Sequence, residues 1–291
     1  MEYRQLGAAG AFVSRIGLDT ATLEGVDQQA AERLVGTALD AGVTFVQAAE
    51  SASGRAEEVL GRVLGDRRRD IVLAAGLRSR HGVAPHRTGQ SRLHVSQALD
   101  DTLRRLRTDH VDLYRVHGVD PCTPVEETLL ALDDAVHQGK VRYVACSGLA
   151  AWRVTKALGV SALHGLAAFV AVESPYGPED RQAERDLVPM VMAENLALVV
   201  TAGTAGTTTA GVAAALGATP AQVALAWQLT RQAVTCALAT PAGVDDTAAL
   251  LAAADLSLPE ELRSRLDGPP APGFAAPAGS GEPATLLARS A

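Results

Sequence analysis

The sequence predicts an α/β protein that folds as one closed (β/α)8 barrel, the TIM-barrel architecture. Three observations predict it: the 291-residue length, a regular alternation of apolar segments with helical patterns, and eight such pairs in a row. Barrels of this kind run to about 250 residues, and eight consecutive βα units imply a parallel sheet that closes on itself.

The elements follow one another in chain order. Short apolar runs predict strands over 12–20, 43–49, 70–77, 110–118, 141–149, 166–174, 196–203 and 234–241. Helical periodicity predicts helices over 27–42, 55–65, 91–109, 124–140, 151–159, 180–195, 219–232 and 244–254. The helix over 91–109 has one leucine-rich side, and the helix over 124–140 begins near a proline and ends at Gly139.

The two ends of the chain differ from the barrel pattern. Residues 1–17 include "AAG", which suggests a small hairpin before the first barrel strand. Residues 268–291 are rich in Pro, Ala and Gly, and we expect an irregular tail there. The predicted organisation is a barrel domain over 1–267 followed by this tail.

Composition narrows the function class. The net charge of −7 argues against nucleic acid as the main partner, and the basic run at 65–70 is flanked by acids and is interpreted as a solvated turn. Three widely spaced cysteines predict neither a disulfide framework nor a metal site. The N-terminus is unlike a signal peptide, and no apolar run reaches the ~18 residues of a membrane span, so we expect a cytoplasmic protein with no membrane partner.

Several segments resemble the aldo-keto reductases in order and spacing. The most specific are "HVDLYRVHGVD" at 110–120 and "ALDDAVHQGKVRYVACS" at 131–147, and the resemblance extends over roughly 2–267. It implies a (β/α)8 barrel in which NADPH lies across the mouth and passes a hydride to a carbonyl.

The resemblance also implies a catalytic set of Asp, Tyr, Lys and His, of which this chain keeps one member. The Asp position falls on Gln47, the Tyr position on Ala52 and the Lys position on Gly76, while the His position is His117. Since alanine has no proton to give to a developing alkoxide, the general acid of the reductases is missing.

The positions that hold the cofactor in the resembled family are altered as well. The Ser-Asn pair becomes Ser147-Gly148, a glutamine position falls near Ala171, and the aromatic that stacks on nicotinamide falls on Ser174. The loop over the pyrophosphate is shortened around 201–211, and no Arg or Lys occurs over 232–262. A dinucleotide needs donors and positive charge, so we predict no cofactor, with NADPH as the alternative.

In such barrels the working residues lie at the C-terminal ends of the strands. We expect His117, Asp19 and Glu50 to be catalytic, because imidazole and carboxylate groups can exchange protons near neutral pH. The expected substrate contacts are polar residues at the same end of the barrel, namely Thr20, Gln47, Arg78, Ser147, Glu173 and Tyr176.

Three functions remain open on these residues. The first is a cofactor-independent acid/base enzyme, namely a lyase, isomerase, dehydratase or cyclase acting on a small molecule, for which specialised metabolism is one suitable setting. The second is an atypical NADP-dependent oxidoreductase, and the third is a non-catalytic binding or regulatory subunit. The sequence favours the first and leaves the substrate and the oligomeric state open.

Overall fold

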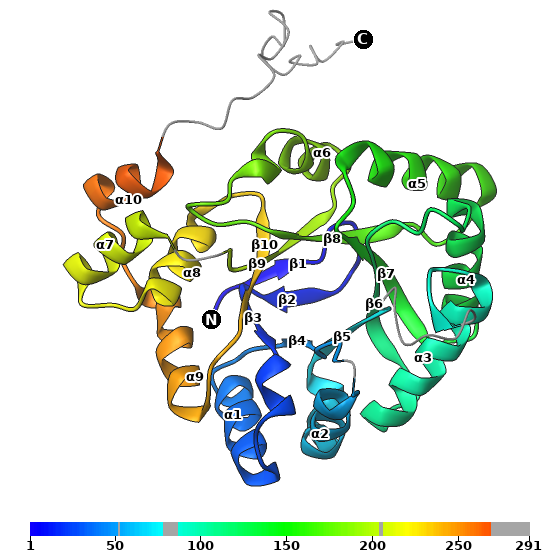
Figure 1. Cartoon of the computed structure of the whole chain (residues 1–291), viewed down its shortest axis with the longest axis horizontal. Helices are drawn as coiled ribbons and strands as arrows, with labels where there is room; N and C mark the ends of the chain where they lie inside the picture. Colours follow the sequence, from blue (N-terminus) through cyan, green and yellow to red (C-terminus); the bar gives the residue numbers. More distant parts are fainter. Residues whose placement is uncertain (52, 78–86, 204–205, 269–291) are drawn as a thin grey trace, which may run out of the picture.

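The computed structural model describes residues 1–51, 53–77, 87–203 and 206–268. Eight parallel strands form a closed barrel in the order β10-β3-β4-β5-β6-β7-β8-β9, which confirms the predicted fold class (Figure 1). The strands are β3 (Ile16–Asp19), β4 (Phe45–Gln47), β5 (Val72–Leu77), β6 (Val111–His117), β7 (Val141–Ser147), β8 (Phe169–Pro175), β9 (Ala197–Thr201) and β10 (Val234–Ala239).

The helices surround the barrel (Figure 1). They are α1 (Gln28–Asp40), α2 (Arg55–Leu64), α3 (Arg92–Leu106), α4 (Val125–His137), α5 (Ala151–His164), α6 (Leu187–Ala193), α7 (Thr207–Leu216), α8 (Pro220–Thr230), α9 (Val244–Leu251) and α10 (Glu260–Asp267). Short 3-10 helices are η1 (Ala21–Glu24), η2 (Gly65–Asp70), η4 (Gln182–Glu184) and η5 (Ala252–Asp255).

The predicted hairpin is present as β1 (Tyr3–Gln5) paired antiparallel with β2 (Phe12–Ser14). The single strand predicted over 12–20 is therefore two strands, divided at Arg15. The backbone N–H of Arg15 donates to Glu2 in the hairpin region, while its carbonyl accepts from Ala237 in β10. The chain thus changes partners at this residue, from the hairpin to the barrel.

Three helical segments differ from the prediction. The helix expected over 180–195 is reduced to η4 and α6, because Pro189 has no N–H for an intrahelical bond and is tolerated only in the first turn of a helix. Two helices, α7 and α8, replace the single one predicted between the last two barrel strands, and α10 follows at 260–267. The tail over 269–291 lies outside the described residues.

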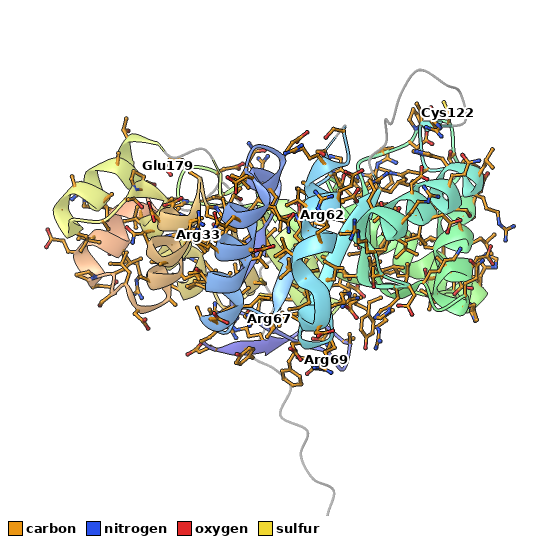
Figure 2. All side chains as sticks on the ribbon, turned by 90° about the horizontal axis from the view of Figure 1, so that it is seen from below. Arg33, Arg62, Arg67, Arg69, Cys122 and Glu179 are labelled. Carbon is orange, nitrogen blue, oxygen red and sulfur yellow. The ribbon has the colours of Figure 1, made fainter. Side chains whose placement is uncertain are left out.

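Two apolar clusters stabilise the barrel. The larger lies between the strands and the helices, and the smaller fills the barrel interior and includes Leu6 and Val13 of the hairpin region. Four of the interior positions are alanines, Ala74, Ala145, Ala171 and Ala197, which leaves space for long polar side chains toward the other end. The hairpin closes the bottom, near Arg67 and Arg69, whereas Cys122 and Glu179 lie at the opposite end (Figure 2).

Candidate active site

The centre of the barrel mouth is occupied by the guanidinium of Arg115, on β6. Its Nη1 donates to Oε1 of Gln47 at 3.0 Å and forms an ion pair with Glu173, and its Nη2 donates to Oε1 of Glu50 at 2.6 Å. The side chains of Arg115, Glu50 and Glu173 are 11%, 12% and 15% exposed. The cluster therefore joins three strand ends through charge-assisted hydrogen bonds that are shielded from water.

Strand register brings these groups together. Arg115 is opposite Gly76 on β5 and opposite Ala145 on β7, so both of its neighbours have small side chains or none. A Cβ placed on Gly76 would overlap Oε1 of Glu50. The missing side chain at position 76 is thus the space that the Glu50 carboxylate occupies next to Arg115.

Below the guanidinium lies a small cavity of about 10 Å³, lined by alanines of three strands together with Gln47, Arg115 and Glu173. This is room for about one water molecule. The Nε of Arg115 is buried here and has no hydrogen-bond partner among the described residues. The interior is closed just below the cluster, so a substrate must approach from the mouth.

His117 follows two residues after Arg115 and is exposed at the mouth. A hydrogen bond of 2.8 Å joins its Nδ1 to Oγ of Ser147, the residue opposite it on β7, and Ser147 is buried. This bond orients the ring, and a Cβ on Gly148 would lie only 3.2 Å from Cε1 of His117, so the glycine gives the imidazole its space. Ser147, expected to contact substrate, is in this structure the hydrogen-bond partner of the catalytic candidate.

Asp19, at the end of β3, is partly buried beside this cluster. Burial raises the pKa of its carboxyl, a nearby Glu50 carboxylate adds to the rise, and the N–H of Ala21 together with the charge of Arg115 opposes it. The N–H of Ala21 donates to Oδ1 at 2.8 Å. A carboxyl of this kind keeps its proton to higher pH than an exposed aspartate and can therefore act as an acid.

Replacing Asp19 by asparagine should stabilise the protein increasingly as the pH rises. The native state holds the Asp19 proton more tightly than the unfolded state, so wild-type stability falls once the pH exceeds the ordinary value of 3.8 and continues to fall up to the raised one. Asparagine removes this loss and keeps the acceptor for Ala21. Urea unfolding at several pH values should show a free energy of unfolding that gains with pH for Asp19→Asn and does not for the exposed Asp255→Asn. A gain for Asp19→Asn that is the same at every pH would contradict this prediction.

Two of the expected substrate contacts lie elsewhere. Thr20 is fully buried, where its hydroxyl donates to the carbonyl of Gln47 and accepts from the N–H of Ala49. Tyr176 is buried against Trp227 of α8 with ring centroids 5.1 Å apart, and its hydroxyl donates to Glu184. Both side chains therefore support the fold at the mouth and do not line it. Arg78 and Ala52 lie outside the described residues.

Two helix ends near the mouth carry carboxylates. Oε1 of Glu179, from the loop after β8, accepts from the N–H and the hydroxyl of Thr209 in the first turn of α7. The first turn of α9 contains Asp245 and Asp246, and Asp246 accepts from the N–H of Ala242. Helix N-termini are the usual places for a bound phosphate, and here both are next to negative side chains.

Arg115 was not among the site residues predicted from the sequence. A usable signal was present, because residues two apart on a strand face the same side, and Arg115 lies two residues before His117. Glu50, expected to be catalytic, and Glu173, expected to contact substrate, are both held by this one arginine.

Within the described residues, no group of three or more metal-ligating side chains is close enough to hold an ion. No single helix in the described part of the chain is long and apolar enough to cross a membrane. Taken together, α7 and α8 have the length and apolar composition of a span, but a bend of 98° lies between them. All three cysteines are free.

Comparison with known proteins identifies the family. The Aldo/keto reductase family model matches residues 15–212, about two thirds of the chain. This chain belongs to the aldo/keto reductase family. An uncharacterized oxidoreductase of Bacillus subtilis, YrpG, is 31% identical to it over 95% of this chain and 98% of that protein.

The names of two further relatives indicate different roles. A probable voltage-gated potassium channel subunit beta of Oryza sativa is 34% identical over 68% of this chain and 62% of that protein. The versiconal hemiacetal acetate reductase of Aspergillus parasiticus is 27% identical over 68% and 66%. The names of these two relatives therefore give a channel subunit in one case and a reductase in the other.

Proposed function

We propose that this aldo/keto reductase family member is a cofactor-independent acid/base enzyme, a lyase, isomerase, dehydratase or cyclase acting on a small molecule in the cytoplasm. The observation that carries the proposal is the cluster of Arg115 with Glu50 and Glu173. Glu50 takes the space beside Gly76, where the resembled family has its lysine. Arginine stays charged in proteins, so Arg115 cannot supply the proton that a reductase must give to an alkoxide.

His117 and Asp19 would then exchange protons with the substrate. Imidazole groups serve as general acids and bases in enzymes, and the hydrogen bond between Nδ1 and Oγ of Ser147 orients this ring at the exposed mouth. Asp19, whose pKa burial raises, is the complementary acid. Arg115 fixes the carboxylates of Glu50 and Glu173 in place at the mouth.

The residues present do not fit NADPH. Glu179 caps α7, aspartates begin α9, and no lysine or arginine occurs over 232–262 to meet a phosphate. A carboxylate at the place of a phosphate repels it instead of holding it. At the nicotinamide end, Gly148 and Ala171 have no side-chain amide to offer. When bound in this family NADPH supplies a hydride, and no step proposed here requires one.

Two measurements test this function. Calorimetric titration with NADPH should detect no binding, and a micromolar dissociation constant would favour the atypical oxidoreductase that the names of several relatives suggest. Proton NMR in D2O of a panel of small carbonyl compounds should show enzyme-dependent exchange or elimination at carbon next to the carbonyl without any cofactor. If the protein neither binds NADPH nor catalyses exchange or elimination, a binding or regulatory subunit is favoured, and the rice relative is named as a probable channel subunit.

A further inference from the structure

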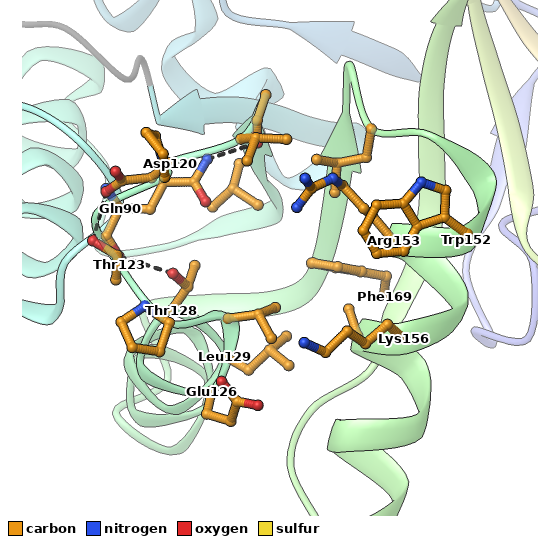
Figure 3. Close-up of a pocket in the computed structure, with 18 residues that line it drawn as sticks. Gln90, Asp120, Thr123, Glu126, Thr128, Leu129, Trp152, Arg153, Lys156 and Phe169 are labelled. Atoms are coloured by element: carbon orange, nitrogen blue, oxygen red, sulfur yellow. Dashed lines mark hydrogen bonds between the residues drawn. The ribbon is translucent and has the colours of Figure 1, made fainter.

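A second cavity of about 550 Å³ lies outside the barrel, between α4 and α5 and over the strands they cover (Figure 3). It is separate from the mouth, because alternate residues of β6 face opposite sides of the strand. Arg115 contributes to the barrel interior, whereas its neighbour Val116 lines the outer cavity. Cavities that bind small molecules in proteins have volumes of about 300–1,000 Å³.

The inner wall of this α4–α5 cavity is apolar. Val116, Leu129 and Phe169 line it, and each is less than a tenth exposed. At the rim, Trp152 of α5 is 60% exposed, which is a large apolar surface to leave in water. An exposed indole beside an apolar floor favours a flat apolar ligand, because aromatic side chains bury large areas with little loss of conformational freedom.

Two cations point into the same cavity. Figure 3 shows the guanidinium of Arg153 and the amine of Lys156 directed inward from α5, one turn apart. Among the described residues neither forms an ion pair, and the one contact found for the Arg153 guanidinium is the ring of Trp152, 4.4 Å away. The first turn of α5 has no acidic residue, so the positive end of the helix adds to the same potential.

The acidic residues of the lining do not neutralise these cations. Asp120 accepts hydrogen bonds from the N–H groups of Gln90 and Cys122 and from the hydroxyl of Thr123, so its oxygens are already used within the loop. Glu126 is exposed on α4, the opposite wall. The α5 side of the cavity therefore combines an apolar floor with two unpaired positive charges.

We propose that the α4–α5 cavity binds a flat, apolar small molecule carrying one negative group, such as an aromatic carboxylate or sulfonate. The ring packs on Phe169 and Trp152, and the anion lies between Arg153 and Lys156. Arginine binds planar anions through paired hydrogen bonds, and the lysine adds a compact second charge.

A pair of fluorescent probes that differ in charge tests this site. The sulfonate is 8-anilinonaphthalene-1-sulfonate, and N-phenyl-1-naphthylamine has the same rings without the anion. The double change Arg153→Gln/Lys156→Gln should raise the dissociation constant of the sulfonate about 10-fold, and that of the amine by less than about 2-fold. Trp152→Ala should weaken both probes, because both lose the indole surface.

Matched variants separate this site from others. Arg33→Gln, an exposed arginine on α1 (Figure 2), should leave both dissociation constants unchanged, and Glu126→Gln should tighten binding of the sulfonate. His117→Ala should also leave them unchanged, because it alters only the mouth. The proposal is overturned if the double variant binds the sulfonate as wild type does, or if His117→Ala weakens it equally. Loss of probe binding as the protein dimerises would show instead that a second copy covers the cavity.

Discussion

Replacing Arg115 by methionine is expected to lower the free energy of unfolding by about 3–5 kcal/mol. Methionine fills a similar volume but leaves the carboxylates of Glu50 and Glu173 without a cation in a site where they are only 12% and 15% exposed. A buried charge that loses its partner is among the most destabilising single changes in a protein. Equilibrium unfolding in urea, followed by circular dichroism, measures the loss.

The control is an arginine of an exposed ion pair. Arg104 pairs with Asp101 on the surface of α3, where the two side chains are 71% and 36% exposed, so Arg104→Met should cost less than about 1 kcal/mol. Adding Glu50→Gln and Glu173→Gln to Arg115→Met should recover most of the stability, because the uncompensated charges are gone. An Arg115→Met protein as stable as Arg104→Met would show that the cluster is not a source of stability.

The barrel was predictable because its signals are local. Each strand has its own apolar run and each long helix its own periodicity, and eight repeats of the same unit allow only a few closed arrangements. The division of 12–20 into two strands was missed, since it depends on Arg15 bonding to Glu2 on one side and Ala237 on the other. Such partners are distant in the sequence and leave no local pattern.

The candidate site was predictable only in part. His117, Asp19, Glu50 and Glu173 are at strand ends or just beyond them, which is where a barrel places its functional groups. Their grouping was not visible, because it depends on Arg115 from within a strand and on the side chain that Gly76 lacks. Tyr176 was misplaced because the alternation of β8 ends near Pro175, and its ring packs instead on Trp227.

Replacing His117 by alanine is expected to lower the rate of substrate proton exchange by about 10²–10⁴-fold, the range for one general acid or base. The imidazole is exposed at the mouth, but its loss removes the hydrogen-bond partner of the buried Ser147 hydroxyl, so the free energy of unfolding should fall by about 1–3 kcal/mol. The rate is read by NMR in D2O on any compound that the wild-type protein exchanges. A loss of rate in protein that is still folded at the assay temperature, as circular dichroism shows, separates catalysis from folding.

Three comparisons identify the role of the ring. His164→Ala removes an exposed histidine from the last turn of α5 and should leave the rate unchanged. Ser147→Ala should lower the rate less than His117→Ala, because the imidazole remains but loses the hydroxyl that orients it. Asp19→Ala should lower it by removing the acid. If His117→Ala and Asp19→Ala both retain full turnover, proton transfer occurs elsewhere, because those two groups are the acid/base pair that the mechanism requires.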